Sequence, residues 1–220
     1  MSVKINDWLP DLMPRLPGIT EEFLLLEIFS AVRQLCEDGR AWTELFGPLS
    51  SKANNPTIYL DPLFQNARVG YVWRATFRGN SNVEKILTPA PQAPLIRNTA
   101  IEPRAFMMVG PGTVELIPTP NQDWDNRYRF DLSVIPTAAT VYLPDYFMTH
   151  WQDAVIDGTC GRCMSMISKP WTNQQQAIIH NRLFRNHIKR CRAITSSKFS
   201  TGQAWTYPDF ARQRTGGGAI

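Results

Sequence analysis

Cys160 and Cys163 have the spacing in this chain that comes nearest to a chemical site, because a Cys-x-x-Cys pair can be a redox dithiol or half of a zinc site. The redox version needs a strand that feeds a helix, whereas this pair falls late in a predicted helix. A zinc site could add His187 and Cys191, which share one helix face at i and i+4. Buried free cysteines that pack as small apolar side chains are the commoner case. We therefore expect no metal and no cofactor.

The other candidate residues form no catalytic constellation. The histidines, His150, His180 and His187, occur in no nucleophile elbow and no H-E-x-x-H pair. Asp153 and Asp157 are one helical turn apart, which is typical of a solvated helix edge or of ion-pair partners. The run 216–218 of three glycines has no helix after it, as a phosphate-binding loop would need. We predict that the protein is not an enzyme.

Length and composition indicate one compact domain or two small lobes. The chain has 220 residues, of which 43% are hydrophobic, enough to bury a core. No apolar run approaches the roughly 20 residues that a helix needs to span a bilayer, and Met1–Asp7 lacks the apolar stretch of a signal peptide. We expect a soluble protein made in a cytoplasm, with its cysteines reduced and no membrane partner.

The order of helical and strand patterns predicts an insertion. Helical periodicity covers about 20–39 and returns near 143. Between these segments, β-branched and aromatic residues with much alternation predict about six antiparallel strands. Because the flanking helices must share one core, we predict an α+β fold, in which an antiparallel helical bundle carries an inserted β-sandwich or barrel-like lobe.

The predicted boundaries follow from these patterns. We expect an extended N-terminal arm at 1–19, a helical bundle at 20–50 and 144–195, an inserted β-rich domain at 51–143, and an extended C-terminal tail at 196–220. Prolines exclude a helix of any length from the arm.

The last helix is predicted to begin at a capping box formed by Thr172 and Gln175. Its periodicity predicts an inward face, which consists of Ile178, Ile179, Leu183, Phe184, Ile188 and Cys191. The opposite face is basic and carries Arg182, Arg185, Lys189, Arg190 and Arg192.

Charge divides the chain unevenly. Residues 1–161 hold 13 Lys and Arg against 18 Asp and Glu, a net −5, whereas residues 162–220 hold 10 against 1, a net +9. The basic helix could line a channel that carries DNA or could dock on an acidic protein surface. Basic side chains on a helix face are also commonly just solvated.

The tail is rich in aromatic residues. Phe199, Trp205, Tyr207 and Phe210 occur in a polar, glycine-containing segment with no obvious place in the subunit's own core. Large aromatic side chains are typical anchors of protein interfaces. We therefore predict that the tail docks on a neighbouring protein.

Several stretches carry tryptophan, proline and glycine in a distinctive order. They are Trp8-Leu9-Pro10, Leu16-Pro17-Gly18 and Ala31-Val32-Arg33-Gln34-Leu35-Cys36-Glu37 with Trp42 beyond; Leu143-Pro144, Trp151-Gln152-Asp153-Ala154-Val155-Ile156-Asp157-Gly158-Thr159 and Gly161-Arg162; and Lys169-Pro170-Trp171, followed by Phe184 and Arg185. In this order the stretches, which cover about half of the chain, resemble the head-to-tail adaptor (connector) proteins of tailed bacteriophages.

The resemblance implies a dodecameric ring between the portal and the tail, with a C-terminal segment that reaches toward the portal. It assigns packing within the bundle or ring to Trp42, Trp151, Gly158, Trp171 and Phe184. It also places Cys160 and Cys163 where relatives carry small or aliphatic residues, which argues against a zinc site.

We therefore expect a structural virion protein at the head–tail junction, assembled in the host cytoplasm. Its expected partners are copies of itself, the portal protein, a tail nozzle or tail tube protein, tail fibres, and genomic DNA that passes through without sequence specificity. One alternative is a nucleic-acid-binding module that uses the basic helix. Another is a metal-dependent or redox enzyme built on Cys160 and Cys163.

Overall fold

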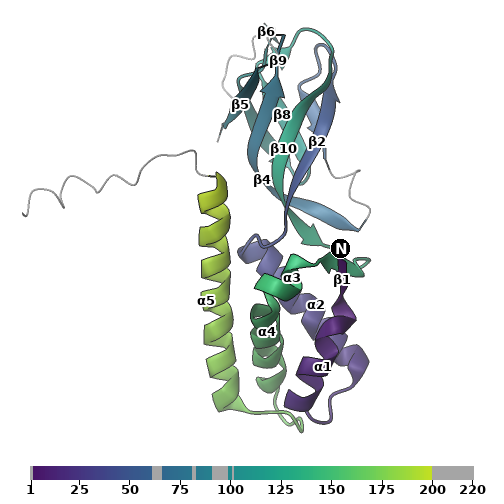
Figure 1. Ribbon diagram of the computed structural model, residues 1–220, viewed down its shortest axis with the longest axis vertical. Coiled ribbons are helices and arrows are strands. Elements are labelled where there is room, and N and C mark those ends of the chain that lie inside the picture. Colours follow the sequence, from purple (N-terminus) through teal and green to yellow (C-terminus); the bar gives the residue numbers. More distant parts are fainter. Residues whose placement is uncertain (1, 61–65, 81–82, 91–98, 101, 200–220) are drawn as a thin grey trace, which may run out of the picture.

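The computed structural model describes residues 2–60, 66–80, 83–90, 99–100 and 102–199. Strands form one end of the molecule and most helices form the other, with the long helix α5 along one side (Figure 1). The prediction of an antiparallel helical bundle with an inserted lobe is wrong. A large, nearly closed, barrel-like sheet of seven strands dominates the fold, so the protein is a mixed α/β protein.

The main sheet has the strand order β2-β10-β4-β5-β7-β8-β3. Its strands are β2 (Thr43–Ser51), β3 (Thr57–Tyr59), β4 (Ala67–Arg78), β5 (Glu84–Pro89), β7 (Ala105–Gly110), β8 (Thr113–Ile117) and β10 (Trp124–Pro136). Two small pairs accompany it: β1 (Ser2–Lys4) with β11 (Tyr142–Pro144), and β6 (Thr99–Ala100) with β9 (Thr119–Pro120).

The sheet differs from the sequence prediction in two ways. The pairs β5–β7 and β6–β9 are parallel, so the strands are not all antiparallel. In addition, nearly all of β2 (Thr43–Ser51) lies in the segment 20–50 that was assigned to the helical bundle. Because β2 pairs with β10, the sheet begins earlier in the sequence than the alternating pattern predicted, and it is larger.

Strand β10 organises the sheet because it pairs with both β2 and β4. Its aromatic residues Tyr128 and Phe130 are fully buried. The ring of Phe77 on β4 lies 5.0 Å from the rings of both Trp124 and Tyr128, measured between centroids. The sheet therefore encloses an apolar core of its own, separate from the core between the helices.

The N-terminal segment is compact rather than an extended arm. After β1 it forms the 3₁₀ helix η1 (Ile5–Trp8), the short helix α1 (Leu9–Leu12) and the 3₁₀ helix η2 (Met13–Arg15). Proline stands in the first turn of α1 and of η2, where its missing N–H costs little. Prolines that exclude a long helix thus permit several short ones.

The longer helices are α2 (Glu21–Asp38), α3 (Tyr146–His150), α4 (Gln152–Met164) and α5 (Gln174–Phe199). α2 follows Thr20 at the N-cap, with Glu21 and Glu22 in its first turn. Acidic side chains there interact favourably with the helix dipole. Helix α5 packs mainly against α4, which also packs against α2.

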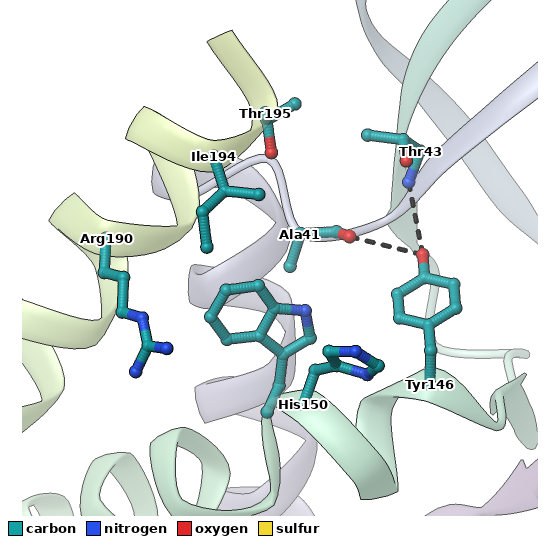
Figure 2. Close-up of a pocket in the computed structure, with 8 residues that line it drawn as sticks. Ala41, Thr43, Tyr146, His150, Arg190, Ile194 and Thr195 are labelled. Atoms are coloured by element: carbon teal, nitrogen blue, oxygen red, sulfur yellow. Dashed lines mark hydrogen bonds between the residues drawn. The ribbon is translucent and has the colours of Figure 1, made fainter. Parts of the chain in front are cut away.

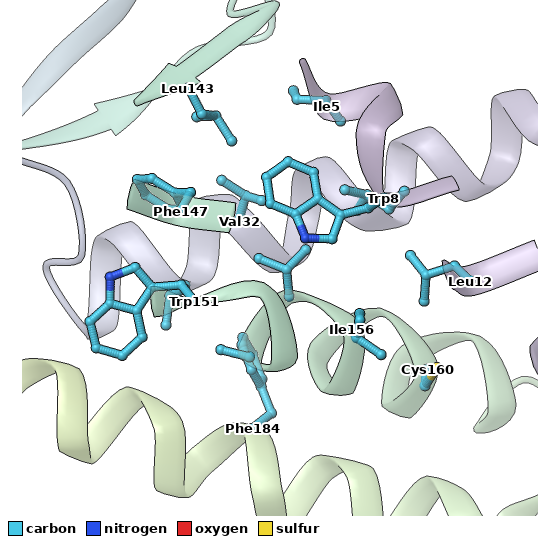
Figure 3. Packing of buried hydrophobic residues seen from close by; sticks show 14 of the residues in the cluster. Ile5, Trp8, Leu12, Val32, Leu143, Phe147, Trp151, Ile156, Cys160 and Phe184 are labelled. Atoms are coloured by element: carbon cyan, nitrogen blue, oxygen red, sulfur yellow. The ribbon is translucent and has the colours of Figure 1, made fainter. Parts of the chain in front are cut away.

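The helical core gathers side chains from distant parts of the sequence (Figure 3). Trp8, Phe147, Trp151 and Phe184 are all buried there, and α4 contributes residues from nearly all of its turns. A Cβ added at Gly158 would lie 2.9 Å from Cε2 of Phe184 and 3.0 Å from Cβ of Ala31. The missing side chain of Gly158 therefore lets α2, α4 and α5 approach closely.

Arg40 joins the helical end to the sheet. It follows α2 in a left-handed backbone conformation (φ 58°). Its guanidinium carbon lies 4.1 Å from the ring centre of Tyr71 and 4.4 Å from that of Trp73, both on β4. Its carbonyl oxygen accepts a hydrogen bond from the Thr195 hydroxyl of α5. Three elements meet at this one residue.

Candidate interaction surface

Helix α5 is the element on which the sequence placed most candidate residues. Its start differs from the predicted capping box, because the side chain of Asn173 accepts the backbone N–H of Gln176, and Thr172 instead donates to the carbonyl of Met166. From that start α5 extends 26 residues. It buries Ala177, Phe184, Cys191 and Thr195, which recur at helical spacing toward α4 and the end of α2.

A buried carboxylate fixes α5 on α4. Oδ1 of Asp157 lies 2.8 Å from Nδ1 of His180, and Oδ2 lies 3.3 Å from Nε2 of His187. Asp157 is 8% exposed. One carboxylate therefore contacts two histidines that are two turns apart on α5, and the burial of this contact makes it stronger than a surface ion pair.

The sequence did not predict this contact. Asp157 was interpreted as part of a solvated edge or an ion pair, and only its pairing with Asp153 was considered. Asp153 is exposed, whereas Asp157 is buried. The sequence did contain one sign of this contact. His180 and His187 are seven residues apart and therefore lie on one face of α5.

Three residues predicted to face inward are exposed. Ile178 is 69% exposed, Ile179 is 50% and Leu183 is 41%. Phe184, Ile188 and Cys191 do face the core or pack against it. The prediction assigned six apolar residues of α5 to one inward face, whereas α5 packs mainly against α4 alone.

The outward side of α5 carries two strips of different chemistry. We call the first the basic strip; its charged members recur every three or four residues and are Arg182, Arg185, Lys189 and Arg192. All of them are exposed, and none has a carboxylate partner among the described residues. Ile178 lies on the same side.

We call the second the apolar strip, which consists of Ile179, Leu183 and Ile194. It follows the other flank of α5, with Arg190 between Leu183 and Ile194. Ile194 is 38% exposed. The five basic residues predicted as one face are thus divided, with Arg190 on the apolar side.

The apolar strip ends at a cavity of about 300 Å³ between α5, α3 and the start of β2. Arg190, Ile194 and Thr195 line it from α5, and Tyr146, His150 and Trp151 line it from α3 and its end (Figure 2). The Tyr146 hydroxyl donates to the carbonyl of Ala41 and accepts the N–H of Thr43. The lining is mixed: Ala41, Trp151 and Ile194 are apolar, and Arg190 is cationic. No acidic residue in the described part of the chain lines the cavity.

The residues assigned to bundle or ring packing are all at the helical end. Trp42, Trp151, Gly158 and Phe184 are buried, and Trp171 packs against the same core, 6.2 Å from Phe23 between ring centroids. Within one subunit these residues stabilise the helical core.

The cysteines are not brought together as a metal site. All four are buried thiols. Burial raises the pKa of Cys160 to about 11 and that of Cys163 to about 12. His187 contacts Asp157 rather than a cysteine, and the described residues include no group of three or more His, Cys, Asp or Glu placed to hold a metal.

The tail residues lie largely outside the described part of the chain. Phe199 is the last residue of α5, and its side chain is not described. Trp205, Tyr207 and Phe210 lie outside the described residues. None of the helices in the described ranges is long and apolar enough to cross a membrane.

Comparisons with known proteins identify no family. No protein-family model matches the chain, and no curated protein matches it. The resemblance to bacteriophage adaptors therefore depends on the sequence motifs quoted above.

Proposed function

We propose that this protein is a subunit of a head-to-tail adaptor ring, a structural virion component that joins the portal to the tail and forms part of the DNA passage. Its partners would be copies of itself, the portal protein, and a tail nozzle or tail tube protein or tail fibres. Assembly would take place in the host cytoplasm.

The outward side of α5 is the observation that carries this proposal. A long helix that exposes Ile179 and Leu183 beside arginines leaves apolar surface in water, which monomeric proteins generally avoid in contiguous patches. Those arginines have no carboxylate partner among the residues that the structure describes. A ring subunit needs large side surfaces, and the basic strip is compatible with a wall that faces DNA. The proposal accounts for both strips with one assembly.

The placement of the motif residues gives further support. Trp8, Trp42, Trp151 and Phe184 come from four separate stretches of the resemblance, and they share one core at the helical end. The sheet end is left free for other contacts, for which tail proteins are the proposed partners.

The first experiment measures the mass of the purified full-length protein, alone and mixed with its candidate portal, by native mass spectrometry or light scattering. We expect a ring, either in isolation or only on the portal. A persistent monomer that is indifferent to the portal would overturn the proposal.

A second experiment tests the tail. Deletion of residues 200–220 preserves all of α5 and should weaken portal binding, because the aromatic anchors Trp205, Tyr207 and Phe210 are removed. Portal binding that is unchanged by the deletion would refute a docking role for the tail while leaving the ring itself to the mass measurement.

A nucleic-acid-binding module is the second candidate, and the basic strip favours it. Phosphate contacts would make binding depend steeply on salt and little on sequence. If the isolated monomer binds DNA in this way, Arg182→Gln with Lys189→Gln should reduce the salt slope. A control exchange, Arg129→Gln on β10, should leave it unchanged.

A further inference from the structure

We infer that the outward side of α5 docks on a second copy of this chain, at a surface that consists of Met13, Glu21, Glu22 and Leu26 and that we call the acidic edge. Subunits would thus associate head to tail through two different surfaces. This inference depends on the proposed ring function and names the partner of the α5 surface. It assigns the basic strip to a neighbouring subunit instead of DNA.

The first argument is charge. The α5 segment 174–199 has six basic residues and no acidic residue, a net +6, whereas the segment 1–39 has three basic and seven acidic residues, a net −4. Of these acidic residues, Glu27 and Glu37 already pair with Arg162 and Arg68, so Glu21 and Glu22 are the ones considered for a partner. Opposite charges on two surfaces of one molecule favour contact between unlike surfaces of two copies.

The acidic edge also exposes apolar side chains. Leu26 on α2 is 64% exposed and Met13 on η2 is 47% exposed. Leu26 is one turn from Glu22, so the two share a face of α2. Glu21 and Glu22 are exposed and have no cationic partner in the described part of the chain. The acidic edge thus combines apolar and charged groups, as the α5 surface does.

The two surfaces point away from each other within one subunit. α2 buries Leu24, Ile28, Ala31 and Leu35 on the side opposite Glu22 and Leu26. Ala31 faces α4 at Gly158, where Phe184 of α5 also lies. The outward sides of α2 and α5 are therefore on different flanks of the helical end (Figure 1). The basic residues of α5 therefore cannot pair with the acidic residues at the start of α2 within one subunit.

Symmetry disfavours a dimer that joins the basic strips. In a two-fold contact through those strips, each would meet an identical basic strip, and like charges in contact cost free energy. A contact between unlike surfaces avoids this repulsion, and it closes into a ring when the rotation per subunit divides a full turn. If DNA were the partner of α5, the apolar strip would remain exposed to water.

Charge reversal in two separate variants tests the inference. The first variant carries Arg182→Glu and Arg185→Glu on α5, and the second carries Glu21→Lys and Glu22→Lys on the acidic edge. Each alone should self-associate at least about tenfold more weakly than the wild type, because the exchanges reduce the charge difference between the two surfaces, from +6 to +2 in 174–199 or from −4 to 0 in 1–39. In an equimolar mixture every contact can again join unlike charges, so association should return with the two variants alternating.

The measurement is sedimentation velocity on the full-length proteins, with native mass spectrometry of a mixture in which one variant is isotopically labelled. Circular dichroism checks that each variant is folded, and Arg129→Glu on β10 is the matched control that should associate as the wild type does. If a variant fails to fold, the wild type still provides a test, since added salt should weaken its association.

The outcomes separate this inference from the proposed function. Self-association that is insensitive to both reversals and to salt, or a mixture that fails to recover, would overturn the inference even if the portal is bound. A wild type that stays monomeric with and without the portal would overturn both. Recovery in the mixture without portal binding would support the inference and count against the adaptor function.

Discussion

Asp157 carries the polar contact that holds α5 in place, because its two oxygens contact His180 and His187. Asp157→Asn removes the negative charge and leaves an amide whose N–H₂ group cannot accept a hydrogen bond. We expect a loss of about 1–3 kcal/mol in the free energy of unfolding, the range for a disrupted buried hydrogen bond. Urea unfolding monitored by circular dichroism measures it.

The matched control is Asp153→Asn, one turn earlier on α4. Asp153 is exposed, so its exchange should change stability by less than about 0.5 kcal/mol. Equal effects of the two exchanges would show that Asp157 stabilises α4 itself rather than the docking of α5.

The buried thiols give a prediction about pH. Burial raises the pKa of Cys160 to about 11, whereas a thiol in an unfolded chain ionises near about pH 8.5. Between these values only the unfolded chain loses the proton, so rising pH favours unfolding. The contribution of Cys160 to stability is therefore complete below about pH 8.5 and declines toward pH 11.

Thermal unfolding between pH 7 and pH 10.5 tests this prediction. We expect the melting temperature of the wild type to fall above about pH 8.5, and to fall less steeply in Cys160→Ala, which has no thiol to ionise. Cys160→Ala will also melt lower at neutral pH, since it leaves a cavity. If the melting temperatures of the two proteins fell equally steeply with pH, ionisation of Cys160 would not be a cause of the lost stability.

At the scale of elements, Gly158 sets how closely three helices pack. Gly158→Ala would add a Cβ 2.9 Å from the Phe184 ring and 3.0 Å from Cβ of Ala31, so α5 or α2 must shift. Overpacking of this kind costs about 1–3 kcal/mol, more than alanine gains in helix propensity. Thermal unfolding of the variant checks the sign.

Gly110→Ala provides the control for Gly158→Ala. A Cβ at Gly110 meets no atom within 4 Å, so this exchange should be nearly neutral. A stabilised Gly158→Ala protein would mean that the helices separate without cost.

Sequence patterns predicted some elements well and others poorly for identifiable reasons. The helical periodicity at 20–39 predicted the limits of α2 well, because the whole helix lies along one stretch of sequence. Strand β2 was missed because Gly47 and Pro48 interrupt its pattern, although the bulged pairing with β10 accommodates them.

The inward face of α5 was only partly predictable. Ile178, Ile179 and Leu183 have the spacing of a buried face, and periodicity alone cannot tell a surface buried within the chain from one left for a partner. The Asp157 contact was likewise hidden, because it joins residues of two helices and no local pattern pairs them.

At the scale of the whole molecule, the two separate cores predict separate opening. Phe77→Ala in the sheet core and Phe147→Ala in the helical core should each cost about 3–5 kcal/mol. Because the cores share no buried side chain, each exchange should reduce hydrogen-exchange protection mainly in its own end of the molecule. Hydrogen exchange measured by mass spectrometry tests this.

Uniform loss of protection in both variants would instead show that the joint at Arg40 couples the two ends into one cooperative unit. The contacts of Arg40 with Tyr71, Trp73 and Thr195 are the route by which such coupling would pass.

The separation of charge between α5 and the N-terminal edge gives the molecule a permanent electric dipole moment that its net charge of +4 conceals. Two copies that approach in dilute salt will rotate each other before they touch, since each positive flank is drawn toward the other's negative flank. Productive collisions are thereby enriched over random ones, and this enrichment fades as the Debye length shortens. The same feature should hold the protein on a cation-exchange resin more tightly than its net charge suggests.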